Sequence, residues 1–226
     1  MEKSSLSLNY KIAITAVFGA LSIILSFTPL GYIQLGGLIA ITIMHIPVIL
    51  AAILGGLWSG LGVSLVFGLS SLIRAVTAGT SPFFLNPAVS ILPRLLIPIF
   101  SWGIFTALDA IPHFPKTISG AISAAIGTLT NTVFVMGAIY IFYGKELVNG
   151  MSAVLERLGF SLDVQGLKGY FAILFCTLAT NGIWEIIAAV VLCTAVLGSV
   201  FAVKNKKSKI SRSLESESNE NADREK

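Results

Sequence analysis

The chain has 226 residues, of which 55% are hydrophobic and only 12% are charged, whereas about 25% of the residues in a soluble domain are charged. With a mean hydropathy of +0.87, this composition argues against a water-soluble fold and indicates a chain that lies in lipid. The net charge of +4 comes largely from a basic cluster directly after the last apolar run, so it is a membrane-topology signal and argues against a nucleic-acid surface. The cluster consists of Lys204, Lys206, Lys207, Lys209 and Arg212.

Six apolar segments divide the chain, because a bilayer core about 30 Å thick requires about 20 apolar residues per helix. The expected helices cover residues 11–27, 41–54, 58–73, 91–111, 118–143 and 170–203. The second and third are shorter than a full span. They suggest helices that are tilted around a cavity. The N–H and C=O groups of irregular backbone at membrane depth need hydrogen-bond partners from protein or water. The sequence therefore predicts an all-α integral membrane bundle of about six transmembrane helices.

The segments between and after these helices are polar or rich in glycine. Residues 30–37 are expected to be irregular. In the loop of residues 144–168, apolar side chains at helical spacing predict a short surface helix; they are Val148, Met151, Leu155 and Leu158. Residues 204–226 are rich in Ser, Glu, Asn and Lys, so we expect a membrane domain over residues 1–203 followed by a disordered charged cytoplasmic tail.

An even number of helices places both termini on one side of the cell membrane. The basic cluster, together with Lys3 and Lys11, predicts that this side is the cytoplasm. Arg74 and Arg94 then lie toward the outer side, against the usual distribution of positive charge, and a ligand is the explanation that we favour.

Arg74 and Arg94 flank one loop that is rich in Thr, Ser and Asn and includes Asn86. Two guanidinium groups there could hold a carboxylate or phosphate by bidentate hydrogen bonds. An ionisable side chain at membrane depth is costly, which makes each arginine a functional candidate. The alternative is that each extends to the lipid head groups.

Further polar groups lie inside apolar helices: His45, Asn131 between two threonines, and Asn181 four residues before Glu185 on the same helical face. They could line a cavity. They could equally make hydrogen bonds between helices, which contribute about 0.6 kcal/mol each in membranes. Glu185 could also neutralise Arg74 or Arg94, and the argument that these arginines bind an anion would then be weaker.

Small residues form strips on two helices, where another helix could approach closely. The first strip contains Ala13, Ala16, Gly19 and Ala20; the second contains Gly120, Ala121, Ala124, Ala125 and Gly127. Each strip could contact a partner protein or pack within this chain.

The sequence contains no HExxH, GxSxG, P-loop or CxxC pattern. We therefore expect no enzyme activity, metal site or cofactor. Because a nucleotide site is also missing, ATP-driven uptake would require partner subunits.

Several motifs, taken in chain order, resemble those of one transporter family. They are Ile41-Thr42-Ile43-Met44-His45-Ile46-Pro47 with Gly55-Gly56, Arg74-Ala75-Val76-Thr77-Ala78-Gly79-Thr80-Ser81-Pro82, Asn86-Pro87, Leu92-Pro93-Arg94, Thr130-Asn131-Thr132, and Asn181 with Glu185. Over about residues 8–203 the chain resembles the substrate-binding S components of energy-coupling factor (ECF) transporters, and it is most similar to the pantothenate-type components.

The resemblance implies a six-helix protein that captures a vitamin from outside and associates with a membrane T subunit and a pair of cytoplasmic ATPases. The family's docking motif matches Ala16 and Ala20, with Ala13 one turn before them. Pantothenate has one carboxylate, for which Arg94 is the first candidate and Arg74 the second. The candidate neutral partners are Asn86, Asn131 and Asn181, with His45 as a further one. The alternatives are an S component for riboflavin, pyridoxine or a hydroxymethylpyrimidine, or a structural membrane protein.

Overall fold

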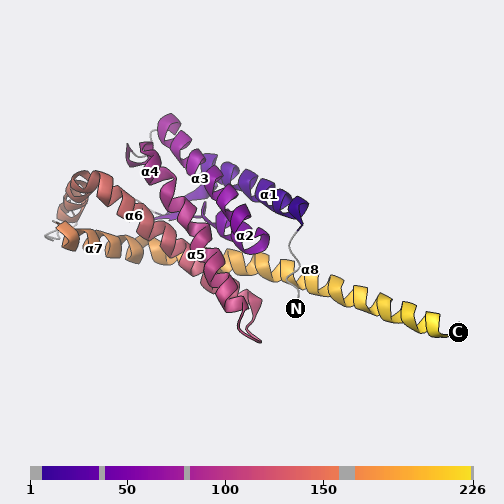
Figure 1. Cartoon of the computed structure of the whole chain (residues 1–226). Coiled ribbons are helices and arrows are strands. Elements are labelled where there is room, and N and C mark those ends of the chain that lie inside the picture. The colour runs from indigo at the N-terminus through magenta and orange to yellow at the C-terminus, as the bar shows by residue number, and fades with distance from the viewer. Residues whose placement is uncertain (1–6, 36–38, 79–81, 158–165, 225–226) are drawn as a thin grey trace.

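The computed structural model describes residues 7–35, 39–78, 82–157 and 166–224, and within them it is a bundle of helices with one short β-hairpin (Figure 1). The α-helices are α1 Leu8–Phe27, α2 Ile46–Gly55, α3 Leu57–Ala78, α4 Pro87–Ser90, α5 Leu92–Asp109, α6 Lys116–Arg157, α7 Gly166–Thr177 and α8 Ile183–Arg224. The hairpin strands are β1 Tyr32–Leu35 and β2 Ile39–Thr42. Short 3₁₀ turns are η1 Pro29–Gly31 and η2 Pro82–Leu85, and a π-helical turn, η3 Leu178–Gly182, joins α7 to α8.

Five helical stretches of the described chain are long and apolar enough to cross a membrane. They are Leu8–Phe27, Leu57–Thr77, Pro87–Asp109, Lys116–Asn149 and Lys168–Lys204. The ten-residue α2 is a shorter sixth apolar helix. The predicted helical membrane bundle is confirmed, and the chain is a multi-pass membrane protein.

The short helix α2 lies at the centre of the bundle, and all ten of its residues are buried. A helix that is apolar all round is expected to be buried. Its neighbours approach closely because Gly60 of α3 has no side chain. A Cβ atom at Gly60 would lie 2.7 Å from the Cβ atoms of Ala52 on α2 and Pro98 on α5. Glycine at this position therefore lets three helices meet.

The two strips of small residues have different surroundings. On α6, a Cβ atom at Gly120 would collide with Leu197 of α8, and one at Gly127 would collide with Ser101 of α5. That strip therefore packs within the chain. On α1, Gly19 is buried against α3, whereas Ala13, Ala16 and Ala20 are exposed. The α1 alanines form a surface that the described part of the chain leaves open.

The expected irregular loop after α1 contains an antiparallel hairpin, in which Tyr32 pairs with Thr42 and Leu35 with Ile39. Its strands are rich in Ile, Tyr, Leu and Thr, and the hairpin ladder lets their backbone groups pair with each other. Residues 41 and 42 consequently belong to a strand, and α2 begins at Ile46 instead of residue 41.

The structure continues α8 to Arg224, and the division into a membrane domain and a disordered tail from Lys204 stays a prediction. No glycine or proline interrupts residues 199–224. Extending a helix that already exists costs much less than starting a new one. In α6, non-helical backbone at Tyr143 separates the predicted span from a second helical segment that ends at Arg157. This segment agrees with the predicted short helix, although Leu158 lies outside the described residues.

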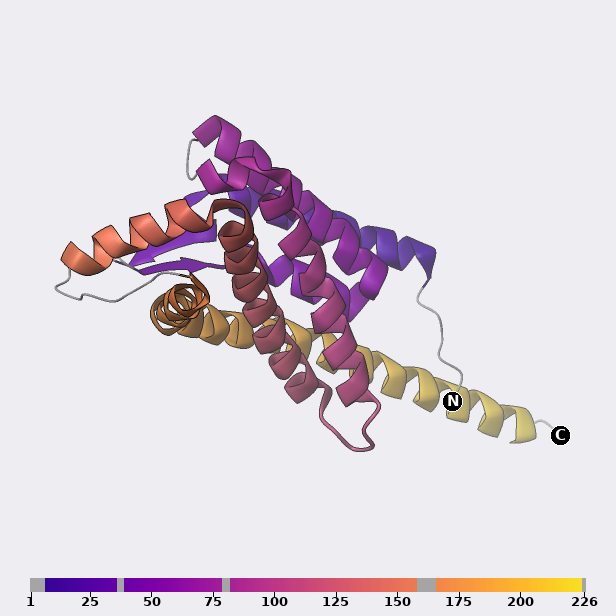
Figure 2. The same ribbon diagram turned by 60° about the vertical axis from the view of Figure 1, so that its left-hand side comes forward.

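The start of α1 and the end of α8 lie at the same end of the bundle in two views (Figures 1 and 2). The hairpin and the part of α6 that follows Tyr143 lie toward the opposite end (Figure 2). The bundle therefore has two different ends.

Candidate functional site

A cavity of about 230 Å³ opens between the base of the hairpin and helices α3, α5, α6 and α8. Its volume is below the range of about 300–1,000 Å³ that is usual for sites of drug-sized ligands, so it suits a small solute. It is lined by Thr42, Met44, Phe67, Phe84, Arg94, Asn131, Thr132, Val135, Met136, Thr177, Asn181, Gly182 and Glu185. A few polar groups thus converge in a largely apolar pocket, as is typical of small-molecule sites.

Arg94 is the basic residue among the described side chains that line the cavity, and it is 4% exposed. Its guanidinium donates hydrogen bonds to the Val89 carbonyl and to Ser71 Oγ, the latter at 3.5 Å. The Cζ atom lies 4.9 Å from the ring centre of Phe84 and 5.5 Å from that of Phe67. These contacts hold the cation in position within the cavity.

The local sequence places Arg94 in the first turn of α5, directly after Pro93. Proline suits this position because a backbone N–H in the first turn of a helix has no intrahelical partner, so its absence costs little. The helix N-terminus adds partial positive charge to the same place. The Ser64 hydroxyl of α3 donates to the Arg94 carbonyl, which fixes the backbone as well.

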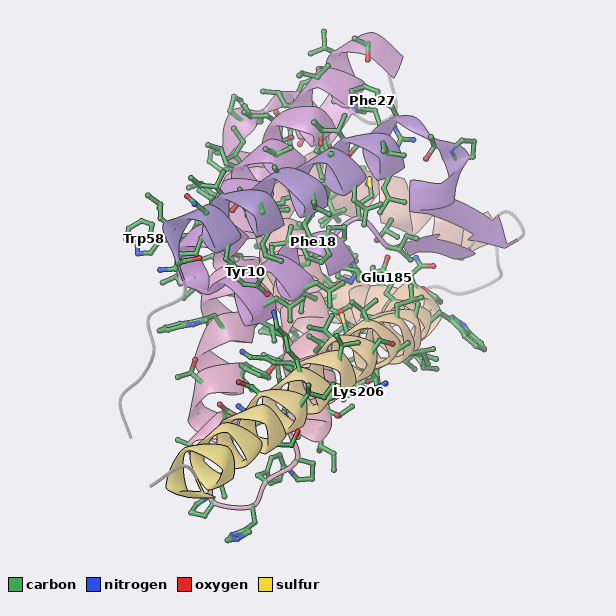
Figure 3. All side chains as sticks on the ribbon, turned by 90° about the vertical axis from the view of Figure 1, so that its right-hand side faces the viewer. Tyr10, Phe18, Phe27, Trp58, Glu185 and Lys206 are labelled. Atoms are coloured by element: carbon green, nitrogen blue, oxygen red, sulfur yellow. The ribbon has the colours of Figure 1, made fainter. Side chains whose placement is uncertain are left out.

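Glu185 provides the acidic group of the cavity and is 7% exposed. Its Oε1 atom accepts a hydrogen bond from the Thr42 backbone N–H at 3.0 Å and a second from the Thr42 hydroxyl. Thr132 is a further hydrogen-bond partner of the carboxylate. Figure 3 shows Glu185 where the start of α8 meets the hairpin.

Two amides complete the polar lining, Asn131 from α6 and Asn181 from the π-helical turn η3. The buried Oδ1 atom of Asn131 has no hydrogen-bond partner among the described residues. A π-helical turn inside a longer helix is rare and often marks a functional site. Here it brings Asn181 and Gly182 to the cavity wall, on the face they share with Glu185.

The structure brings together three of the six predicted site residues: Arg94, Asn131 and Asn181 all line the cavity. The other three are outside its lining. Arg74 is half-buried on α3. The Asn86 side chain caps α4 by accepting from the Ala88 N–H at 2.9 Å. His45 is buried, and its Nε2 lies 3.0 Å from Thr128 Oγ1 of α6, which agrees with the alternative of a hydrogen bond between helices.

Sequence reasoning did not place several lining residues in the site. Glu185 and Thr132 were recognised as polar groups within apolar helices but were not among the predicted site residues, and their closeness to Asn181 and Asn131 in sequence was the available signal. Thr42 belongs to a segment that was expected to be helical. Phe67 carried no signal, because an aromatic residue on an apolar helix usually belongs to a core.

The fold and the cavity define a multi-pass membrane protein that can bind a small solute. The family model "ECF transporter, substrate-specific component" matches residues 10–197, and the chain belongs to this family. A curated relative, the pantothenic acid transporter PanT of Lactococcus lactis subsp. cremoris (strain MG1363), is 26% identical over 222 residues, which cover 91% of this chain and 99% of that protein. The predicted S-component resemblance is confirmed, and the chain is a transporter component.

Proposed function

We propose that this chain is the vitamin-binding subunit of an ECF importer and that its ligand is pantothenate. The observation that carries the proposal is the buried cation Arg94 in a small cavity that also contains two amides and a carboxylate. The PanT relative supports the choice of ligand. The subunit binds the vitamin and releases it unchanged, without a cofactor, so it is not an enzyme.

Pantothenate has one carboxylate, one amide and two hydroxyl groups. In our proposal its carboxylate binds Arg94, and its neutral groups bind Asn131 and Asn181. The protein already holds the Arg94 side chain in place before a ligand arrives. Binding therefore costs little additional side-chain conformational entropy. Arg74, Asn86 and His45 lie outside the cavity lining, and we assign them no direct contact with the vitamin.

The sequence leaves S components for three other ligands as alternatives. Riboflavin, pyridoxine and hydroxymethylpyrimidine are built on aromatic rings and lack a carboxylate. A buried guanidinium would gain less from such ligands than from an anion. The cavity therefore favours pantothenate over these vitamins, and also over a structural role in which the polar groups would only join helices.

The partners that we propose are a membrane T subunit and a pair of cytoplasmic ATPases. The exposed alanines Ala13, Ala16 and Ala20 of α1 offer the T subunit a smooth surface for close helix packing. The basic residues after the last span favour a cytoplasmic location for the end of α8. Since α1 starts at the same end of the bundle, both termini would be cytoplasmic. The hairpin end would then face outward across the cell membrane.

The test is a titration of purified protein, in detergent or lipid nanodiscs, with pantothenate, riboflavin, pyridoxine and hydroxymethylpyrimidine by calorimetry. Mass spectrometry of co-purified small molecules provides an independent readout. We expect saturable one-to-one binding of pantothenate. Saturable binding of a different vitamin, with none of pantothenate, would reject the ligand, and failure of all four to bind would reject the vitamin-binding role.

A further inference from the structure

Glu185 is a second ionisable group in the cavity, and the proposed contacts with pantothenate do not use it. It comes from α8, whereas Arg94 comes from α5, and both side chains line the same space. Burying a carboxylate at membrane depth costs free energy, so Glu185 is a candidate functional residue. The groups that bind it therefore need to be identified.

The hydrogen bonds of Glu185 leave it able to accept another donor. An ionised carboxylate offers about four acceptor sites. The Thr42 N–H and hydroxyl both bind Oε1. Thr132 has a single hydroxyl hydrogen, and the same hydroxyl lies 3.3 Å from the Thr128 carbonyl, to which it can also donate. The described residues therefore supply fewer donors than an ionised carboxylate can accept.

Asn131 adds a second acceptor to the same wall. Its Oδ1 atom is buried and has no hydrogen-bond partner among the described residues. It is adjacent in sequence to Thr132, which binds Glu185, and Asn131, Thr132 and Glu185 all line the cavity. A buried oxygen without a donor is unfavourable unless a ligand or a water supplies one.

We propose that Glu185 and Asn131 form an acceptor subsite that determines specificity by binding the hydroxyl groups of the ligand, away from its carboxylate. This inference rests on the proposed function. A hydroxyl donates its hydrogen to the subsite, whereas an anionic group lacks a donor and is repelled by Glu185. The transporter should therefore accept a monocarboxylate whose other end is neutral and hydroxylated, and should reject the phosphate ester of the same molecule.

The test measures the affinity of three ligands for each of four proteins. The ligands are pantothenate, an analogue with hydrogen in place of the terminal hydroxyl, and the phosphate ester on that hydroxyl. The proteins are wild type, Glu185→Gln, Glu185→Asp and Glu146→Gln. Glu146 is exposed on α6 beyond Tyr143 and does not line the cavity, so its amide variant controls for the loss of one negative charge.

In wild type, removal of the hydroxyl should weaken binding about tenfold to a hundredfold, the range expected for one hydrogen bond to a charged group. In Glu185→Gln, removal of the hydroxyl should weaken binding by about threefold or less. The ratio of the affinities for pantothenate and its phosphate ester should fall by about tenfold or more relative to wild type. Glu185→Asp keeps the charge and should keep that discrimination. Glu146→Gln should match wild type.

The outcomes separate the inference from the proposed function. If wild type binds none of the three ligands, the proposed function fails and this inference fails with it. If wild type binds pantothenate but binds the phosphate ester equally well, the inference alone is wrong, and this comparison needs no variant to fold. It is also wrong if Glu185→Gln weakens pantothenate and the deoxy analogue by the same factor, because Glu185 would then only support the hairpin through Thr42.

Discussion

Arg94 illustrates how a buried charge can be retained at membrane depth. Its guanidinium contacts the rings of Phe67 and Phe84 and donates to Val89 and Ser71. The wide, weakly hydrated guanidinium suits such contacts better than a lysine ammonium would. These contacts stabilise the cation in place, and the cavity exposes it to a ligand.

We predict that Arg94→Gln weakens pantothenate binding by about 2 kcal/mol, or roughly thirtyfold, because a charge-assisted hydrogen bond in a desolvated site is lost. Pantothenol has an alcohol in place of the carboxylate, so its binding should change much less. Calorimetric titration of both ligands measures the difference. The matched control is Arg74→Gln, which replaces an arginine outside the cavity lining and should leave both affinities unchanged. Equal losses for the two ligands in Arg94→Gln would mean that Arg94 supports the fold and does not bind the carboxylate.

At the scale of elements, the site depends on interruptions of regular helices. The π-helical turn η3 carries Asn181, non-helical backbone at Tyr143 ends the first segment of α6, and the hairpin brings Thr42 to Glu185. Two of these interruptions reach the cavity directly, because Asn181 and Thr42 both line it. Irregular backbone at membrane depth is tolerated where it is buried in protein or lines a cavity.

The turn between α2 and α3 allows a test of backbone strain without a steric effect. Gly56 has φ 87° and ψ 176°, a conformation open essentially only to glycine, yet a Cβ atom there would meet nothing within 4 Å. Gly56→Ala should therefore lower stability by about 1–3 kcal/mol through the backbone alone. The measurement is thermal unfolding of the purified protein in detergent.

Gly103→Ala is the matched control for this substitution, because Gly103 lies inside α5, its φ is outside the left-handed region, and it also has open space around its Cβ position. Alanine there should leave stability unchanged or raise it by up to about 1 kcal/mol. Similar unfolding temperatures for the two variants would contradict the assignment of strain to Gly56.

At the scale of the whole molecule, the proposed vitamin site and the proposed docking surface for the T subunit lie on different elements. The cavity lies between α3, α5, α6, α8 and the hairpin, whereas the exposed alanines lie on α1. A change on α1 can therefore affect assembly without reaching the vitamin.

We predict that Ala16→Trp abolishes pantothenate uptake in cells while purified protein still binds the vitamin, because an indole would hold the T subunit's helix away. The measurements are uptake of labelled pantothenate and calorimetric titration of the same variant. Val191→Trp, at a 60% exposed position on α8, is the control and should retain uptake. Normal uptake by Ala16→Trp would place the docking surface elsewhere.

Sequence alone determined the class of fold and the family. Hydropathy summed over about 20 residues is a local property, and it indicated the membrane spans without knowledge of their packing. The first segment of α6 ends at Tyr143, where the apolar run was expected to end. Composition alone did not indicate that α8 continues to Arg224, because composition indicates whether a segment can form a core but not whether an existing helix continues through it.

Tertiary structure decided which polar residues meet. Arg94 and Arg74 were both candidates for the carboxylate, and Asn131 and Asn86 were both candidates for neutral contacts, yet one of each pair lines the cavity and the other does not. The partner of Glu185, Thr42, is 143 residues away in the chain and belongs to a strand. Contacts of this kind depend on the rotation and depth of each helix, and these follow from the packing of all neighbours at once. A short stretch of sequence cannot determine them, because the same apolar pattern is compatible with many rotations about the helix axis.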